Sequence, residues 1–291
     1  MSTQPPFGPL GVIDAQLGRQ TRQPPRARRI AWKLLWWIVF LLGAVYFVLP
    51  LIGTLAFALK DKPFGHAFTS LPENKLFVST LLFSGMLGVI TIIISTALVV
   101  PTAFWVRLRL PRLRPVVEFV TLLPFVVPPI VLVFGLIGTY APPPLSVTGT
   151  EVGSIALTVA AYVVLSLPYM YRAVDTGLGA IDVRSLTEAA QSLGSGWFTI
   201  IWRVILPNVR VAVLSGAFLT LAIVLGEFTI ATFLLPADRA FAPFLGLLGN
   251  ADPFQQASAA LISFGLTWIA MLLIAYIGRG SQSRVTLGGA R

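Results

Sequence analysis

The chain alternates long apolar blocks with short polar segments, and the length of the blocks indicates the class of protein. A helix needs about 20 apolar residues to cross a bilayer. A soluble domain carries about 25% charged residues, whereas only 11% of these 291 residues are charged. We therefore predict an all-α, polytopic membrane protein with six transmembrane helices. The predicted spans are residues 30–58, 77–106, 116–139, 154–173, 208–234 and 256–278.

The basic residues predict the orientation of these spans. If the N-terminus is cytoplasmic, all but four of the 21 Lys and Arg residues lie on the cytoplasmic side. Short cytoplasmic loops are enriched in Lys and Arg, so we predict that both termini are cytoplasmic. This assignment also accounts for most of the net charge of +10 without a nucleic-acid partner. The four exceptions are Lys60, Lys62, Lys75 and Arg239.

The two ends of the chain are polar. Residues 1–29 are rich in Pro, Gln and Arg and have no apolar period, which predicts a disordered, basic cytoplasmic tail near anionic lipid headgroups. Residues 281–291 are predicted to form a second cytoplasmic tail. The apolar run of the block 30–58 is much longer than the core of a signal peptide, which has about 7–15 residues. We therefore expect it to be a retained first transmembrane helix.

One polar segment stands out between the fourth and fifth spans, on the predicted cytoplasmic side. Its sequence over residues 183–210 is VRSLTEAAQSLGSGWFTIIWRVILPNVR. Ser185 and Glu188 have the spacing of a capping box, in which a Ser at the helix start and a Glu three residues later bond each other's backbone. Gly194 suits the left-handed backbone position that follows many helices. The pattern thus predicts a short helix between Ser185 and Gly194.

A second short helix is predicted over about 196–204, and Pro207 is expected to end it before span five. Soluble loops rarely expose a cluster of bulky apolar side chains without a partner or a core to receive it. We predict that this helix protrudes as an apolar wedge that binds another protein. The alternative is a helix that lies on the membrane surface. The cluster consists of Trp197, Phe198, Ile200 and Ile201. Small residues beside it, which another backbone can approach closely, are Ala189, Ala190 and Gly194.

This segment resembles the "EAA" loop of bacterial ABC-importer permeases, the binding-protein-dependent inner-membrane components. The resemblance extends over about residues 70–280 and leaves the first span as a family-variable addition. It implies the type I ABC importer permease fold in the bacterial cytoplasmic (inner) membrane. Residues 183–207 would then form a coupling helix seated in a groove of a cytoplasmic ATP-binding subunit. Matching the motif are Glu188-Ala189-Ala190, Gly194, Val204 (usually Ile in the family) and Leu206-Pro207. The coupling residues are thus expected to be Ser185, Glu188, Ala189, Ala190, Gly194, Trp197, Leu206 and Pro207.

The resemblance also implies partners. They are two cytoplasmic ATP-binding subunits, a second permease in a heterodimer, and an extracytoplasmic solute-binding protein. A P-loop needs the pattern G-x-x-x-x-G-K-[ST], and none of the chain's four lysines follows a glycine. We therefore expect a non-catalytic permease without a cofactor, whose partner subunits bind ATP and Mg. Without cysteine and with one histidine, the chain is not expected to hold a metal either.

Two spans carry features that a transport pathway needs, namely interrupted backbone or polar side chains at membrane depth. Pro124, Pro128 and Pro129 interrupt span three, where they either expose carbonyl groups to a cavity or form a simple kink. Glu227 lies in span five, with Thr220 two turns before it. Glu227 either lines the pathway, which suits a cationic solute, or bonds a neighbouring span at the interface between permeases. The pathway candidates are Glu227, Thr220, Pro128 and Pro129.

The sequence constrains the transported solute less than it constrains the class of protein. LPFVVPPIVLVFGL (residues 123–136) and GEFTIATFLLP (residues 226–236) look most similar to permeases for polyamines such as spermidine and putrescine. They are also close to permeases for ferric iron, thiamine and small oxyanions. A secondary carrier would show inverted repeats and a membrane-embedded enzyme would show converging catalytic groups, and the sequence indicates neither. Three extracytoplasmic segments either bind the solute-binding protein or are ordinary solvated loops. They are residues 59–76, 140–153 and 235–255.

Three acidic residues lie near the predicted cytoplasmic boundary. Glu118 begins span three beside Arg112 and Arg114, with which we expect an ion pair at the membrane surface. Such exposed pairs contribute little to stability. Asp175 and Asp182 precede the polar segment and are expected to be solvated or to cap a helix.

Overall fold

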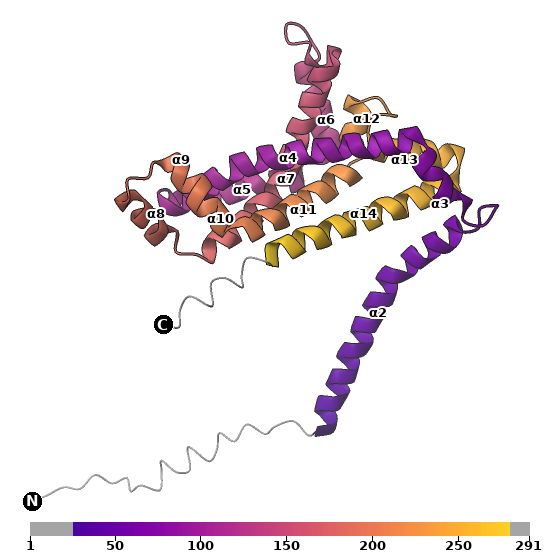
Figure 1. Ribbon diagram of the computed structural model, residues 1–291, viewed down its shortest axis with the longest axis horizontal. Helices are drawn as coiled ribbons and strands as arrows, with labels where there is room; N and C mark the ends of the chain where they lie inside the picture. Colours follow the sequence, from indigo (N-terminus) through magenta and orange to yellow (C-terminus); the bar gives the residue numbers. More distant parts are fainter. Residues whose placement is uncertain (1–25, 280–291) are drawn as a thin grey trace, which may run out of the picture. The chain divides into compact units, whose positions relative to one another are not determined.

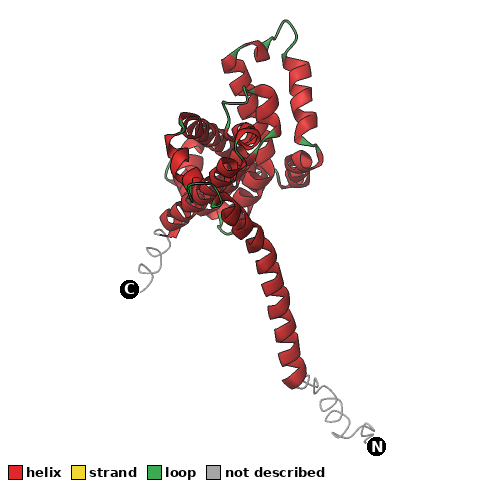
Figure 2. Cartoon of the chain, turned by 90° about the vertical axis from the view of Figure 1, so that its right-hand side faces the viewer, coloured by secondary structure: helices red, strands yellow, loops and turns green. Residues whose placement is uncertain are grey.

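A computed structural model of the chain describes residues 26–279, and within that range it contains helices and loops but no strand (Figure 2). The all-α prediction is therefore confirmed. The chain divides into two units between Gly53 and Thr54. The first helix, α2 (Arg26–Ala58), begins four residues before the predicted start and continues across this division. The predicted tail at residues 281–291, and residues 1–25 of the other predicted tail, lie outside the described residues.

Among the described residues, four helices are long and apolar enough to cross a membrane, by length and composition. They are α2, α4 (Lys75–Leu108), α7 (Glu151–Gly179) and α14 (Pro253–Arg279). Two further candidates are pairs of helices bent by 96° and 80°. If each pair is one span, the described residues contain six spans, which is the predicted number. The bent pairs are η2 (Pro111–Leu113) and α5 (Arg114–Val126) with α6 (Pro129–Tyr140), and residues 197–208 with α11 (Arg210–Gly226).

Span three is broken where two prolines follow each other. Pro128 precedes α6 with an extended backbone (φ −59°, ψ 142°), and Pro129 is the first residue of α6. Because neither proline has an N–H to donate, the helical ladder of α5 stops and a new one begins. Pro124 is tolerated inside α5. The predicted interruption is therefore confirmed, and Figure 1 shows α6 rising steeply from α4, α11 and α14.

Span five is not the continuous helix predicted over 208–234. α11 ends at Gly226, and Glu227 has an extended backbone (φ −76°, ψ 108°) before the short helix α12 (Thr229–Leu234). α12 packs against α6, with Phe134 and Phe233 in ring contact at 5.0 Å between centroids. The broken end of span five therefore rests on the broken half of span three.

Two of the three segments predicted to be extracytoplasmic loops contain short helices that bury apolar side chains. Residues 235–255 include α13 (Phe241–Ala251), whose Phe241 and Phe244 belong to an apolar cluster. Residues 59–76 include α3 (His66–Ser70) and η1 (Leu71–Glu73), and Leu71 is fully buried in the same cluster. The expectation of solvated loops is therefore wrong for these parts. Residues 140–153 contain only the short turn η3 (Val147–Gly149) and the start of α7.

Helix α7 lies against both α4 and α11 and joins the bundle through small residues. The hydroxyl groups of Ser95 on α4 and Ser166 on α7 are buried and 2.7 Å apart. A Cβ placed on Gly177 of α7 would lie 2.5 Å from the Cβ of Ala212 on α11. Small residues allow membrane helices to approach each other closely, so these contacts define how α4, α7 and α11 fit together.

We predict that Gly177→Ala lowers the stability of the chain, because its methyl group forces α7 and α11 apart. Overpacking of this kind costs about 1–3 kcal/mol. The measurement is the melting temperature of the purified chain in detergent, followed by circular dichroism. Gly138→Ala is the matched control, since a Cβ on Gly138 meets no atom within 4 Å. Equal melting temperatures of the two variants would contradict the close approach of α7 and α11.

Candidate functional site

The polar segment begins with helix α8 (Val183–Ser192), which Asp182 caps. The Asp182 carboxylate accepts the Ser185 N–H at 3.1 Å and the Ser185 hydroxyl at 2.7 Å. Glu188 instead pairs with Arg184 at 2.8 Å. The predicted capping box is therefore wrong: Ser185 lies three residues inside the helix, and Asp182 is the cap. The expectation that Asp182 caps a helix is confirmed.

The hydrogen bonds to Asp182 also fix the pH range in which this cap operates. The Ser185 hydroxyl and the backbone N–H of Ser185 lower the pKa of the Asp182 carboxyl. A carboxyl whose pKa is lower in the folded state stabilises that state above its unfolded pKa and loses this contribution as the pH falls through its folded pKa. The cap is therefore complete at neutral pH and is lost only in acid.

Helix α8 ends in the left-handed turn that the sequence predicts. Gly194 has φ +77°. Its N–H donates to the Gln191 carbonyl at 2.8 Å, and the Ser195 N–H donates to the Ala190 carbonyl at 3.0 Å. These two bonds form a Schellman motif. A Cβ at Gly194 would meet nothing within 4 Å, so the glycine is required here for its backbone angle and not for lack of space in this chain.

The second helix of the segment is longer than predicted and contains a wide turn. α9 (Trp197–Thr199) continues into the π-helical turn η4 (Ile200–Ile205) and α10 (Leu206–Asn208). Pro207 lies in the first turn of α10, where a missing N–H is tolerated. The expectation that Pro207 ends the helix is therefore wrong, because the bend of 80° comes after Asn208.

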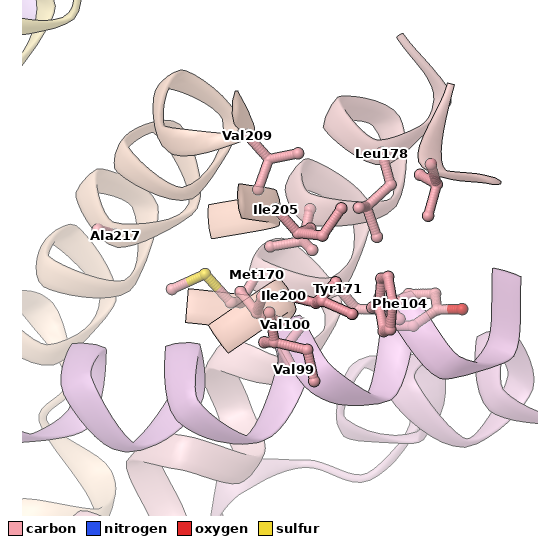
Figure 3. Close-up of a cluster of buried hydrophobic side chains, with 14 of the residues drawn as sticks. Val99, Val100, Phe104, Met170, Tyr171, Leu178, Ile200, Ile205, Val209 and Ala217 are labelled. Atoms are coloured by element: carbon pink, nitrogen blue, oxygen red, sulfur yellow. The ribbon is translucent and has the colours of Figure 1, made fainter. Parts of the chain in front are cut away.

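The apolar side of this second helix is buried in the chain's own core, so the predicted wedge is mostly wrong. Ile200 and Ile205 are fully buried and Ile201 is 6% exposed, packed against residues of α4 and α7 (Figure 3). Ala190, which was expected to be open to a partner, is 8% exposed and belongs to the same cluster. Phe198 alone of the four predicted wedge residues is exposed, at 77%.

Trp197 attaches the segment to the end of α4. Its ring lies 4.7 Å from that of Trp105, and the Arg109 guanidinium lies 5.4 Å above it. The Trp197 side chain is half-buried, and with Arg109 and Glu188 it borders a cleft of about 330 Å³ between α4 and α8. Of these contacts, the sequence pattern indicated only that Trp197 needs a neighbour.

The segment nevertheless exposes a group of residues, which we call the docking surface. Leu193 is 86% exposed and Phe198 is 77% exposed, although both are large apolar side chains. The docking surface consists of Glu188, Ala189, Leu193, Gly194 and Phe198, all of them exposed. Of the other predicted coupling residues, Ser185 and Pro207 are exposed and Leu206 is half-buried.

The pathway candidates divide into two groups. Pro128 and Pro129 lie at the start of α6, which packs against the α12 helix that follows Glu227, so the structure brings these elements together. Thr220 is fully buried, and its hydroxyl donates to the Gly216 carbonyl of its own helix at 2.9 Å. Thr220 therefore does not extend a polar stripe along a path.

The Glu227 carboxylate bonds the backbone that follows it. It accepts the N–H groups of Thr229 at 3.1 Å, Ile230 at 2.7 Å and Ala231 at 3.4 Å. Neither of the two predicted alternatives included this role. A carboxylate that accepts the first N–H groups of the next helix is recognisable when the helix break is known, but the apolar run around Glu227 concealed that break.

Asp175 is the acidic residue whose role the sequence reading missed. It pairs with Arg114 at 2.8 Å and with Arg107 at 3.5 Å, and so links α7 to α5 and α4. Arg114 also pairs with Glu118 at 2.9 Å, as predicted. Asp175 is therefore neither solvated nor a cap.

Comparison with known proteins gives a consistent result. The family model for the binding-protein-dependent transport system inner membrane component matches residues 99–285. A probable molybdenum ABC transporter permease protein of Haloferax volcanii is 28% identical over 271 residues, covering 88% of this chain and 97% of the relative. The molybdenum transport system permease protein ModB of Mycobacterium tuberculosis is 33% identical, covering 64% of this chain and 70% of the relative. The spermidine/putrescine transport system permease protein PotB of Haemophilus influenzae is 26% identical, covering 82% and 88%.

Solved structures share the fold. A chain of a bacterial ABC transporter that imports the acidic polysaccharide alginate matches with a TM-score of 0.69 and 14% identity, covering 88% of this chain and 98% of that chain. A chain of the MetNI methionine ABC transporter in an inward-facing conformation matches with a TM-score of 0.54 and 17% identity, covering 72% and 97%.

Proposed function

Because this chain belongs to the family of binding-protein-dependent transport system inner membrane components, and is thus a permease subunit of an ABC importer, we propose that it transports a small tetrahedral oxyanion of the molybdate type. The observation that carries this proposal is the relationship to molybdenum permeases, which extends over 88% of this chain in one case. Selection of the solute would rest mainly with an extracytoplasmic binding protein, as the resemblance implies.

The acidic residues of the spans also favour an anion. Polyamines carry several positive charges, and a path for them needs carboxylates with free oxygens. Among the described residues of the spans, Glu227 already accepts three backbone N–H groups, and Asp175 and Glu118 are paired with arginine. These groups are therefore poorly available to a cation. A polyamine is the second candidate, because PotB is also among the relatives.

The docking surface is proposed to bind a cytoplasmic ATP-binding subunit. Leu193 and Phe198 expose large apolar side chains beside the small residues Ala189 and Gly194. A concave apolar groove is the complement of such a surface. We propose two ATP-binding subunits, a second permease and an extracytoplasmic solute-binding protein as the partners, with ATP and Mg bound by the ATP-binding subunits.

A substitution at Gly194 tests the docking surface. Asn tolerates the left-handed backbone, and a Cβ at Gly194 meets nothing within this chain, so we expect Gly194→Asn to fold and to insert normally. If a groove encloses this position, the variant should lower the solute-stimulated ATP hydrolysis of the assembled importer about tenfold or more. A tenfold effect corresponds to a loss of about 1.4 kcal/mol in the free energy of the contact with the partner.

The control for this experiment is Arg112→Asn, which places the same side chain at an exposed position of a different predicted cytoplasmic loop, outside the docking surface. This variant should retain stimulated hydrolysis. Full stimulation in the Gly194→Asn importer would count against a partner at the docking surface.

The solute is tested by uptake into proteoliposomes that contain the complete importer and its binding protein. We expect ATP-dependent uptake of radiolabelled molybdate, and competition by tungstate because it is a tetrahedral oxyanion of almost the same size. Spermidine in excess should leave uptake unchanged. ATP-dependent uptake of spermidine without uptake of molybdate would replace this proposal with the second candidate.

A further inference from the structure

The cleft between α4 and α8 contains an arginine that no carboxylate of the described residues neutralises. The cleft has a volume of about 330 Å³ and adjoins the docking surface, because Glu188 belongs to both. Two guanidinium groups and one carboxylate line it, those of Arg109, Arg184 and Glu188. Glu188 pairs with Arg184 at 2.8 Å, and Arg109 takes part in none of the ion pairs of the described range. Asp182, which lies near Arg184, does not line the cleft and bonds Ser185.

The Arg109 side chain is held in place without using its hydrogen-bond donors. Its guanidinium lies over the Trp197 ring, 5.4 Å from the ring centroid, and the Trp197 ring lies 4.7 Å from that of Trp105. A guanidinium carries five N–H donors at its edge, and those of Arg109 donate to no residue that the structure describes. Arg109 is also exposed. It therefore offers a positioned cation with free donors.

A partner on the docking surface would change the surroundings of this charge. Leu193 and Phe198 of that surface are 86% and 77% exposed. A protein that covers them also excludes water from the adjoining cleft. Burying a charge without a counter-charge is strongly unfavourable. A partner that fits the docking surface therefore has to bring a negative charge to Arg109.

We propose that an Asp or Glu side chain of the cytoplasmic ATP-binding subunit enters this cleft and pairs with Arg109. The inference rests on the proposed function, because it names a contact of the partner assigned to the docking surface. A guanidinium binds a carboxylate through two parallel N–H···O bonds. Gln191, which is exposed and lines the same cleft, has an amide that can donate a further bond.

This pair would give the partner a second point of attachment. The docking surface lies on the polar segment, whereas Arg109 directly follows α4, and its backbone N–H donates to the Trp105 carbonyl of that helix at 2.9 Å. The acidic side chain would thus connect the ATP-binding subunit to the end of α4 without an intermediate residue of the segment.

The test is the affinity of the purified ATP-binding subunit for the assembled permease pair in phosphatidylcholine nanodiscs, measured by biolayer interferometry at low and at high salt. Arg109→Gln should raise the dissociation constant at low salt about tenfold or more, because it removes one partner of a buried charge pair. The same variant should weaken the salt dependence of binding. Arg109→Lys keeps a positive charge over Trp197 and should lose less affinity than Arg109→Gln.

Arg112→Gln is the matched control. Arg112 is an exposed arginine three residues further along the same loop and does not line the cleft. Its replacement should change the affinity about twofold at most. Equal losses in Arg112→Gln and Arg109→Gln would overturn the proposal, since they would indicate general attraction between the loop and an acidic subunit. Equal losses in Arg109→Lys and Arg109→Gln with unchanged salt dependence would also overturn it, since they would indicate a purely structural role.

Two further outcomes separate this inference from its alternatives. Weaker binding by Gly194→Asn together with wild-type binding by Arg109→Gln would overturn the inference and leave the docking surface intact, whereas wild-type binding by both variants would overturn both. If the Arg109→Gln loss appears only in nanodiscs that contain phosphatidylglycerol, the occupant of the cleft is an anionic lipid headgroup and the assignment to an acidic side chain is wrong.

Discussion

The burial of Ile200, Ile201 and Ile205 between α4 and α7 is the packing on which the rest of this structure depends. Burying one such side chain contributes about 1.5–3 kcal/mol, so the polar segment is held to the bundle by a substantial part of the core. Trp197 adds a second attachment through its contacts with Trp105 and Arg109. The segment is therefore a part of the bundle, from which only the docking surface protrudes.

This attachment determines how a force on the docking surface reaches the membrane helices. The covalent connection runs to α11, but a bend of 80° separates α11 from residues 197–208. The apolar cluster around the segment also joins it to α4 and α7, and it includes Ala217 of α11 (Figure 3). Since α7 also packs against α11 and pairs with α5 through Asp175 and Arg114, a displacement of the segment acts on several helices together.

The apolar pattern predicted the helical class and most of the spans, because a long apolar run allows few other structures. It could not reveal the helix break at Glu227, since a single carboxylate in an apolar run changes the hydropathy very little. Nor could it distinguish an apolar cluster that needs a partner from one that the same chain buries, as Ile200 and Ile205 show. The left-handed backbone conformation of Gly194 was predictable because few residues other than glycine adopt it.

The central claim is that the docking surface moves with α4 as one body. Because the chain has no cysteine, Leu110→Cys at the end of α4 and Ser192→Cys at the end of α8 provide two unique spin-label positions, both exposed. The measurement is the distance between the labels in the assembled importer, by double electron–electron resonance, with and without ATP. We predict a change of less than about 2 Å, the size of a small helix shift. A change of many ångströms would show that the segment swings independently of α4 and would contradict this account.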